Sequence, residues 1–545
     1  MNGTTYLTGK LFLDLIRAGA SNLRFHVKAV NDLNVFPIPD GDTGYNMLLT
    51  MLGGAQVECE YDNISEVSKK ISQGMLLGAR GNSGVILSQF FDGISHGLED
   101  LDKACVSDLS KALCLGVKSA YDAVLCPTEG TVLTVMREAT EYAASVETDC
   151  LEGFFEAFIF QAKIALDNTP ELLDVLKKAG VVDSGGAGLI YIIEGMLKAL
   201  KVEAFEASYL EDLSENETVD FSLFDENSEM TYGYCTELLV RLQNKKTDIE
   251  KFNTASVTAF LETVGDSIVV VKNDSILKIH VHTKTPEKVL EYLRNFGEFL
   301  TVKIENMTLQ HSNSDVEKPP HKERTKYAVV TVASGEGVKA TFTEMGADVI
   351  VDGGQSMNPS TGEFIEAFDK ANADNIFVFP NNRNIILAAK QAASAYQNSK
   401  VFVVESKNIG DGYAALSMMN TNLETCEEIL SEFEFAMDGV VTVEISKSVR
   451  DSDMQDNVPV ACGDYIGIID KEIIHAEKNR LNTVKSCIEK TGFSLHDISI
   501  IIRGADSTEE EAKQIEDYIK SQNPFSDVYI INGGQNVYSY ILIAE

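Results

Sequence analysis

The chain has 545 residues, 44% of them hydrophobic and 24% charged, and its formal net charge is −37. This length predicts three or four domains, and the composition is that of an ordinary globular protein. The excess of acidic residues argues against a nucleic-acid-binding groove, which needs a basic surface, and against electrostatic docking to anionic lipid.

Nine cysteines are scattered along the chain without a CxxC pair, which is typical of reduced thiols in a cytosol. The N-terminal stretch lacks a basic segment followed by an apolar core, so no signal peptide is predicted. No run of about 18 uncharged apolar residues occurs, so no transmembrane segment is expected. These features predict a cytoplasmic protein.

The first part of the chain has a helical pattern. From Tyr6 to about Ala204 apolar residues recur mostly at helical intervals, as in "GFFEAFIFQAKIALDNT" and "GLIYIIEGMLKAL". The repeated pattern predicts about eight helices joined by loops rich in Gly, Asn and Pro. We therefore expect a helical domain over residues 1–205.

The rest of the chain predicts two α/β domains and two linkers. Residues 206–230 are acidic and weakly periodic, and residues 311–325 are polar with a Pro-Pro pair, so both are predicted linkers. Between them, residues 231–310 combine strand patterns such as "LKIHVHT" with two helical ones. Residues 326–545 alternate short β-branched runs with helical segments, which predicts an α/β domain with a largely parallel sheet. The predicted fold class is multidomain α and α/β.

The stretch "PDGDTG" places Asp40 and Asp42 one residue apart on a turn, just before a helix that begins near Thr43. Carboxylates this close repel, and a divalent cation such as Mg²⁺ removes the conflict. Gly41 and Gly44 permit a tight backbone path, and the helix start offers N–H groups that suit phosphate. An EF-hand is excluded, because tyrosine and methionine stand where it requires Gly and Glu. The loop alone leaves a metal–phosphate site and a solvated polar turn equally open.

Three more Gly-rich or polar junctions lie between helical patterns, in "GARGNSGVILSQ", "PTEGTVLTVMREA" and "VVDSGGAGL". Closely spaced small residues can bring backbone N–H groups near a phosphate. The first junction lacks the GK[ST] ending of a Walker loop, and a single Gly-rich junction is more often only a turn. Four such junctions in one helical domain are more than capping requires.

These four motifs, in this order, resemble the ATP-binding helical domain of the dihydroxyacetone-kinase small-subunit (DhaL) type. The whole chain resembles the kinase subunit of bacterial fatty acid kinases. The resemblance implies an eight-helix barrel that binds ATP, with Asp40 and Asp42 as catalytic Mg²⁺ ligands. Where related kinases have a third aspartate, this chain has Asn34, with Asp32 just before it. The implied ATP-binding residues are Asn34, Thr43, Asn46, Gly81, Asn82, Ser83, Gly84, Thr131, Arg137 and Asp183.

The middle domain contains a possible zinc site. His280 and His282 are two residues apart on a predicted strand and so share a face, from which two imidazoles can chelate Zn²⁺. Cys235 lies on another predicted strand. A lone Cys is most often a small buried hydrophobe, and such a His pair is as often a surface feature as a metal site. The family resemblance implies a zinc site made by Cys235, His280 and His282.

The C-terminal domain resembles the DegV-type fatty-acid-binding proteins. "ASGEG" follows a strand but lacks the GxGxxG pattern, so it is weak support for a nucleotide site. "DGGQSMNPST" is a loop with several hydroxyl side chains. We expect this domain to serve dimerisation or docking of a separate acyl-carrying partner rather than direct lipid binding. Arg383 is interpreted as a charge near a helix N-terminus.

The prediction is a Mg·ATP-dependent kinase subunit. It would phosphorylate the carboxylate of a fatty acid presented by a DegV-like fatty-acid-binding protein, giving an acyl phosphate for phospholipid synthesis. The expected assembly is a homodimer that binds no nucleic acid. One alternative is a kinase for dihydroxyacetone (glycerone) or another small polyol. Another is a non-catalytic scaffold stabilised by zinc, against which the intact "PDGDTG" and "GARGNSG" motifs argue.

Overall fold

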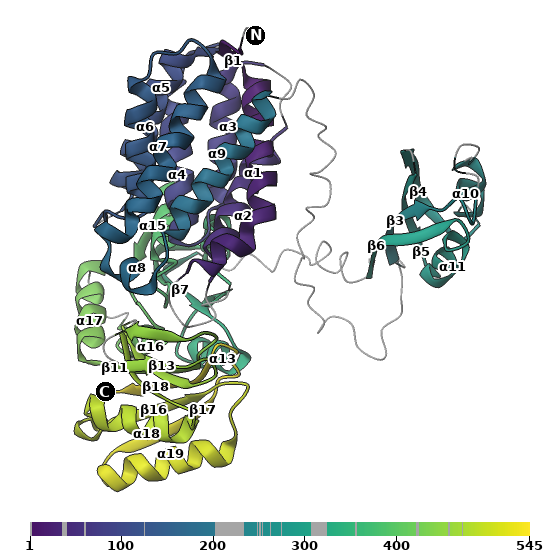
Figure 1. Ribbon diagram of the computed structural model, residues 1–545. Coiled ribbons are helices and arrows are strands. Elements are labelled where there is room, and N and C mark those ends of the chain that lie inside the picture. The colour runs from purple at the N-terminus through teal and green to yellow at the C-terminus, as the bar shows by residue number, and fades with distance from the viewer. Residues whose placement is uncertain are drawn as a thin grey trace. The chain divides into compact units, whose positions relative to one another are not determined.

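The chain divides into two compact units, residues 1–212 with 323–545 and residues 213–322. The structure is a computed structural model (Figure 1). It describes residues 3–34, 41–58, 62–124, 126–201, 234–247, 249, 252, 254–261, 263–273, 275–306, 324–354, 357–420, 425–455, 458–470 and 472–545. The predicted linkers therefore lie almost wholly outside the described residues. No helix among the described residues is long and apolar enough to cross a membrane.

The N-terminal part is helical, which confirms the prediction. Its helices run side by side in Figure 1, with the short α8 at one end. Their bounds are α1 Gly9–Asp32, α2 Thr43–Ala55, α3 Ile64–Gly78, α4 Gly81–Gly97, α5 Val106–Asp122, α6 Val132–Ser145, α7 Leu151–Leu172, α8 Asp174–Ala179 and α9 Ser184–Lys201. A two-residue ladder, β1 (Tyr6–Leu7) with β2 (Ala104–Cys105), ties the chain start to the loop before α5.

Local sequence explains how these helices begin and pack. The Thr8 side chain accepts a hydrogen bond from the Leu11 N–H and so caps α1, whose apolar face then packs on α9. Helices α2 and α3 cross where Gly53 meets Gly74. A Cβ at Gly53 would lie 2.3 Å from the Gly74 carbonyl oxygen, so only glycine permits this approach.

The middle unit is a four-stranded antiparallel sheet with two helices. The strand order is β4 (Gly265–Asn273), β5 (Ile276–Thr283), β3 (Tyr234–Leu242), β6 (Gly297–Asn306). Alternate residues of β3 and β5 are buried with apolar residues of α10 (Thr254–Leu261) and α11 (Pro286–Leu293). This period-two burial is the pattern of a sheet covered on one face, as the alternation in the sequence predicts.

The C-terminal part begins with a four-stranded parallel sheet, as predicted. Its strand order is β10 (Lys400–Val403), β9 (Ala373–Phe379), β7 (Thr325–Ala333), β8 (Val349–Asp352). The helices between and after these strands are α13 Glu336–Glu344, α14 Thr361–Ala371, α15 Ile386–Ala395, α16 Ile409–Ser417 and α17 Cys426–Gly439. Helices α14 and α15 pack one face of the sheet through a buried apolar cluster that includes Phe364 and Phe368.

A second sheet corrects the prediction of one largely parallel sheet. Its six strands are ordered β15 (Glu472–Glu477), β14 (Tyr465–Ile469), β11 (Val441–Lys447), β18 (Tyr538–Ala544), β16 (Ile498–Arg503), β17 (Asp527–Asn532), and only β16–β17 is parallel. The central strands β11 and β18 were missing from the predicted set. Helices α18 (Arg480–Thr491) and α19 (Glu509–Gln522) pack on this sheet, and β12 (Ser452–Gln455) pairs with β13 (Val458–Val460).

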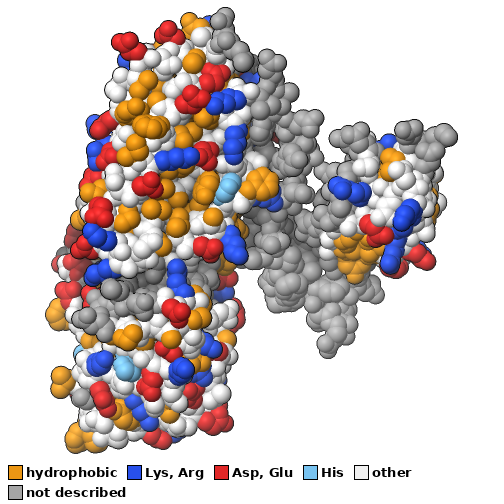
Figure 2. All heavy atoms as spheres, viewed as in Figure 1, with side chains coloured by type: hydrophobic (Ala, Val, Ile, Leu, Met, Phe, Trp, Pro, Cys, Tyr) orange, Lys and Arg blue, Asp and Glu red, His pale blue; other side chains and the backbone are white. Residues whose placement is uncertain are grey.

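The helical part and the parallel sheet belong to one unit and share a core. Ala79 and Val85, at the junction of α3 and α4, are buried in the same apolar cluster as α14 and α15. The Thr361 N–H donates to the Ala79 carbonyl oxygen at 3.1 Å. On the face seen in Figure 2, basic side chains are scattered among acidic and hydrophobic ones over this unit. That face shows none of the clustering of Lys and Arg that nucleic acid binding requires.

Candidate functional site

Four helix N-termini meet at one end of the helical part. The first residues of α2 and α9 lie close together, because the Ser184 Oγ is 3.4 Å from the Thr43 Oγ1. The start of α4 joins them, since a Cβ at Gly81 would lie 2.7 Å from the Asn46 side chain of α2. The start of α6 follows, because the Val132 N–H bonds the Asp183 carboxylate that precedes α9. Converging helix N-termini bring positive dipole ends together, which favours an anion such as phosphate.

Asn34 is held inside this cluster by hydroxyl groups. Its Oδ1 accepts hydrogen bonds from Thr43 and Ser184, each at 3.3 Å. The neighbouring Asn31 side chain accepts from the Gly44 N–H at 2.7 Å and so ties the end of α1 to the start of α2. Asn34 therefore organises the helix starts, and its amide oxygen is engaged by protein groups. Ser184 was not among the predicted site residues.

Asp42 is the residue before α2, yet its side chain makes no capping bond to that helix. Its carboxylate instead accepts a hydrogen bond from the Asn358 side-chain amide of the C-terminal part. The Arg80 guanidinium, just before α4, donates to the Asn358 carbonyl oxygen at 2.9 Å and pairs with Glu363 at 3.1 Å. Asp40 lies outside the described residues, so the predicted carboxylate pair cannot be compared with the structure.

The glycines of the α3–α4 junction are needed for packing. Gly81 has φ +58°, where non-glycine residues are strained, and Asn46 and Asn358 flank it. A Cβ at Gly84 would lie 2.5 Å from the Thr50 Oγ1. Helix contact alone therefore explains both glycines. Of the two residues between them, Ser83 is half-buried, and Asn82 carries a buried Oδ1 without a hydrogen-bond partner among the described residues.

Thr131 and Arg137 make contacts within the protein. The Thr131 Oγ1 donates to the Thr128 carbonyl oxygen at 2.8 Å. Arg137 donates to the Tyr121 hydroxyl at 3.2 Å and to Glu129 at 2.9 Å, and these bonds raise the pKa of its guanidinium. To bind ATP, the Arg137 guanidinium would have to break its hydrogen bonds to Tyr121 and Glu129 or make a further bond beside them.

Asp183 joins two of the helix starts. Burial raises the pKa of its carboxyl to about 6, although the N–H groups of Gly186, Val132 and Gly185 all bond it. The bond from Gly186 is 2.7 Å long. Desolvation therefore outweighs three favourable hydrogen bonds. This carboxyl caps α9 and holds α6 beside it, which makes it a structural part of the end where the helix starts meet.

These residues fit a nucleotide with a divalent cation. The converging N–H groups suit phosphate, and Asp42 offers a carboxylate to a cation. The Oδ1 atoms of Asn82 and Asn358 are buried without a hydrogen-bond partner in the described part of the chain, as amide oxygens that await a cation or water often are. Among the described residues no three His, Cys, Asp or Glu side chains cluster for a metal. Because Asp40 lies outside them, the magnesium site stays a prediction.

The zinc prediction concerns residues whose side chains lie outside what the structure describes. The backbone register places Cys235 of β3 directly opposite His282 of β5, and His280 opposite Glu237. Neighbouring strands therefore bring the three predicted ligands into adjacent register positions, which the sequence pattern did not show. Their metal binding stays a prediction.

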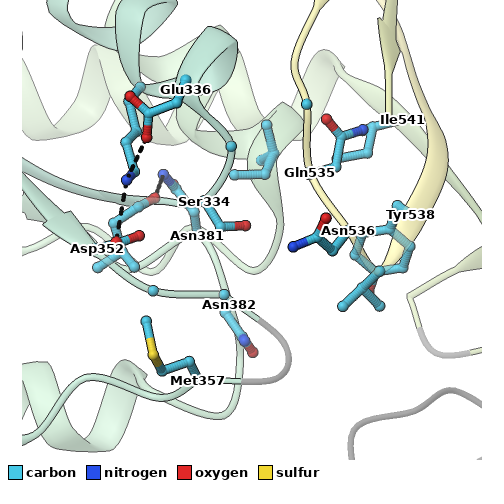
Figure 3. A pocket seen from close by; sticks show the side chains of 18 of the residues that line it. Ser334, Glu336, Asp352, Met357, Asn381, Asn382, Gln535, Asn536, Tyr538 and Ile541 are labelled. Atoms are coloured by element: carbon cyan, nitrogen blue, oxygen red, sulfur yellow. Dashed lines mark hydrogen bonds and ion pairs between the residues drawn. The ribbon is translucent and has the colours of Figure 1, made fainter. Parts of the chain in front are cut away.

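A cavity of about 450 Å³ lies in the C-terminal part, where β7, β8 and β9 end (Figure 3). Parallel sheets often bind ligands at this place. Its one lysine, Lys339, already pairs with Glu336 at 3.0 Å and Asp352 at 3.1 Å. Glu444 also lines the cavity, and burial raises the pKa of its carboxyl to about 7. The Asn381 amide, labelled in Figure 3, donates to the Thr331 Oγ1 at 2.8 Å and to the Val332 carbonyl oxygen at 2.9 Å.

The cavity offers little to an anion. The α13 N-terminus borders it, but the Gly337 N–H of its first turn donates to the Gly533 carbonyl oxygen at 3.0 Å. With that donor used and Lys339 doubly paired, a carboxylate would meet mainly acidic groups and amides. Arg383, which the sequence analysis interpreted as a helix N-terminal charge, pairs instead with Asp470.

Comparison with protein families covers most of the chain. The DAK2 domain model matches residues 37–198, and two models of the fatty acid kinase FakA-like family match residues 231–314 as its middle domain and 328–545 as its C-terminal domain. Protein YloV of Bacillus subtilis is 40% identical over 557 residues, covering 99% of each chain. An uncharacterized protein of Staphylococcus aureus is 38% identical over 555 residues, again covering 99% of each.

The solved structures that align with this chain have lower sequence identity to it than these relatives. A DegV family protein from Corynebacterium glutamicum aligns with 40% of this chain and 97% of its own, at 13% identity and a TM-score of 0.32. The dihydroxyacetone kinase of C. freundii with AMP-PNP and Mg²⁺ aligns with 54% of this chain and 56% of its own, at 12% identity and a TM-score of 0.31. These scores are too low to assign a fold. On its sequence relatives, the chain belongs to the FakA-like family of fatty acid kinase proteins and has a kinase-type DAK2 domain.

Proposed function

We propose that the chain is the ATP-dependent kinase subunit of a fatty acid kinase. It would transfer the γ-phosphate of ATP to the carboxylate of a fatty acid that a DegV-like protein presents, giving an acyl phosphate. The observation that carries the proposal is the meeting of four helix N-termini beside Asp42 in a chain of this family. Phosphoryl transfer depends chiefly on positioning and on neutralising charge, and this end of the helical part offers both.

The proposed roles follow from chemistry. Asp40 and Asp42 would hold Mg²⁺, which neutralises phosphate charge when bound. The N–H groups at the starts of α2, α4 and α9 that no protein group uses would bind phosphate oxygens, with Thr43, Asn46, Ser83 and the Gly81–Gly84 turn around them. No general base is needed on the acceptor side, because a fatty acid carboxylate is already ionised at pH 7. Asn34 and Asp183 keep the helix starts together.

The C-terminal cavity supports a separate acyl carrier. Its paired lysine and its acidic lining do not suit a fatty acid carboxylate. A partner that brings its own acyl-binding site removes this difficulty, because the kinase subunit then needs only a docking surface. A homodimer, which the sequence analysis expects, stays a prediction that light scattering of the purified protein would check.

A coupled assay tests the proposed reaction. The purified full-length chain with Mg·ATP is mixed with a DegV-like protein loaded with oleate, with the same protein free of lipid, or with dihydroxyacetone. We expect ADP release and hydroxylamine-trappable acyl phosphate only with the loaded partner. Turnover on dihydroxyacetone alone would instead identify a polyol kinase. Binding of ATP without turnover on either acceptor would favour the scaffold alternative.

We also propose that Cys235, His280 and His282 bind zinc, supported by the register that places Cys235 opposite His282. Metal analysis of protein purified without added chelator would give about one zinc per chain, as three fixed ligands can bind it. Cys235→Ala should lose that zinc. The exposed Cys114 provides a matched control, because Cys114→Ala removes a thiol from the helical part. Zinc retained in Cys235→Ala would contradict the site.

A further inference from the structure

We infer that the C-terminal part completes the cation side of the nucleotide site through Asn358. This inference rests on the proposed function, because it assigns a positioning residue to the same Mg·ATP site. Asn358 lies on the loop between β8 and α14, 316 residues from its partner Asp42 in the sequence. Its side chain is 3% exposed and touches both Asp42 and the Gly81 turn.

The orientation of the Asn358 amide follows from its partner. A carboxylate accepts hydrogen bonds and cannot donate them when ionised, so the amide nitrogen must face Asp42. The oxygen, bonded to the same carbon as that nitrogen, lies to one side of this hydrogen bond, where it is buried and has no hydrogen-bond partner in the described part of the chain. A buried amide oxygen without a hydrogen-bond partner destabilises the folded state. Such an atom is commonly explained by a bound ion or water.

The backbone of Asn358 is held firmly against the helical part. The Arg80 guanidinium donates to its carbonyl oxygen at 2.9 Å. Arg80 and Ser360 form an isolated β-bridge. The N–H of Thr361, which follows Ser360, donates to the Ala79 carbonyl oxygen. Ser360 and Glu363 form the capping box of α14 and fix the end of the loop. The amide therefore occupies a defined place beside Asp42.

A hard cation prefers oxygen ligands and keeps several waters. Asn34, which stands near the position of a third aspartate in related kinases, has its oxygen engaged by Thr43 and Ser184. Asn358 instead presents an oxygen without a partner among the described residues, beside the Asp42 carboxylate that its nitrogen orients. We assign it two tasks: to orient Asp42, and to accept from or coordinate the hydrated cation. The nucleotide site is then built across the helical and C-terminal parts of one chain.

The test measures binding rather than turnover. The chain has no Trp, so a fluorescent N-methylanthraniloyl-ADP can be titrated without tryptophan interference. Wild type, Asn358→Ala and the control Gln391→Ala are compared with and without Mg²⁺. Gln391 makes the same kind of contact between the two parts, to the Ser88 Oγ at 3.1 Å, and does not touch Asp42.

For Asn358→Ala we expect nucleotide binding to be about tenfold weaker in the presence of Mg²⁺, because one good polar contact is lost. Without Mg²⁺, its nucleotide affinity should equal that of wild type. Gln391→Ala should match wild type in both conditions. If Asn358→Ala and wild type bind the nucleotide equally well with Mg²⁺, the inference is overturned. Tighter binding by Asn358→Ala would also overturn it, because Asn358 would then compete with the cation for Asp42. Wild type that binds no nucleotide with Mg²⁺ would reject the proposed function itself.

A second variant covers the case in which Asn358→Ala does not fold. Asn358→Asp has the same shape but places a second carboxylate beside Asp42, where like charges repel. We expect a lower melting temperature than wild type without Mg²⁺, and a larger upward shift on adding Mg²⁺ with ADP. Equal Mg²⁺-induced shifts in the two proteins would mean that no cation binds beside residue 358, and that result would overturn the inference.

Discussion

Two glycine-rich helix starts in this protein have opposite surroundings. At the end of the helical part, the starts of α2, α4 and α9 lie together, although the Gly44 N–H already bonds Asn31 and the Gly186 N–H already bonds Asp183. In the C-terminal cavity, the start of α13 also follows a glycine turn, yet the Gly533 carbonyl oxygen accepts from its first-turn N–H. Acidic side chains line the cavity beside it. A single glycine-rich helix start is therefore not enough for an anion site: the helical end brings several helix starts together, whereas one start with acidic neighbours borders the cavity.

The helical end and the C-terminal cavity also suit different ligands. The helical end suits nucleotide phosphates, whereas the cavity, with its paired Lys339 and the raised pKa of Glu444, does not suit an acyl carboxylate. In the proposed reaction, one chain supplies the phosphoryl donor and a partner supplies the acceptor. Four substitutions test this separation.

Asp42→Ala should have the largest effect on activity. Loss of a carboxylate for Mg²⁺ is expected to lower turnover about 100-fold or more, close to 3 kcal/mol of transition-state stabilisation. The fold should lose only about 1 kcal/mol, because the Asn358 amide loses its acceptor. Steady-state kinetics and thermal unfolding check both parts. Asp149→Ala, which removes an exposed carboxylate elsewhere in the helical part, is the matched control, and turnover equal to it would remove Asp42 from the site.

Arg80→Ala should have the largest effect on stability. The variant loses the bond to the Asn358 carbonyl oxygen, which a charged donor makes worth about 1.5–3 kcal/mol. The ion pair with Glu363 adds less than about 1 kcal/mol, because the Glu363 side chain is 44% exposed. Calorimetric unfolding would show a lower midpoint than for the exposed control Arg24→Ala. An unchanged midpoint would mean that the two parts of this unit do not depend on the Arg80 contact.

Asp183→Asn should change how stability depends on pH. Burial raises the carboxyl pKa from 3.8 to about 6, so the folded state holds its proton more tightly than the unfolded state. Wild-type stability from this group is therefore lost as pH rises from about 4 to about 6. Asparagine keeps a capping oxygen but has no charge to bury. We expect the variant to gain stability relative to wild type across this pH range, measured by urea unfolding. Parallel curves would contradict the raised pKa.

Glu444→Gln should have the smallest effect on the reaction. If the C-terminal cavity holds no acyl carboxylate, acyl phosphate formation should stay within about twofold of wild type, which is under 0.5 kcal/mol. The stability of the Glu444→Gln variant should rise relative to that of wild type as pH increases from about 4.5 to about 7. Between these values, folding costs wild type free energy, because the pKa of Glu444 is raised from 4.5 to about 7 in the folded state. A marked loss of acyl phosphate formation would mean that the cavity takes part in the reaction. That result would contradict the proposed difference between the cavity and the helical end.

Much of the fold was predictable from local pattern. The helices of the first 201 residues, the strands β3 to β5 and the parallel strands β7 to β10 all carry apolar periods that match their structure. The second C-terminal sheet was missed because β11 and β18 were overlooked. "VTVEISK" and "YSYILIA" are β-branched and aromatic enough to have been recognised. Strand direction was not readable, since antiparallel pairing depends on which segments meet.

The site was predictable in part. Asn34, Thr43 and Asp183 lie where the motifs suggested, at neighbouring helix starts. Arg137 was predicted to contact ATP, but in the structure it bonds Glu129 and Tyr121. Asn358 carried no usable signal, because nothing local connects it to Asp42 across 316 residues.

The sequence by itself determined most helical and strand segments, the family and the residue types that gather where the helix starts meet. These properties depend on local periodicity and on motifs within a few residues. Only the tertiary structure decided which helix starts lie together, that Gly81 and Gly84 are needed for packing, and that Asn358 faces Asp42. Each of these depends on contacts between distant segments, and a donor or an acceptor has no fixed role until the fold supplies its partner.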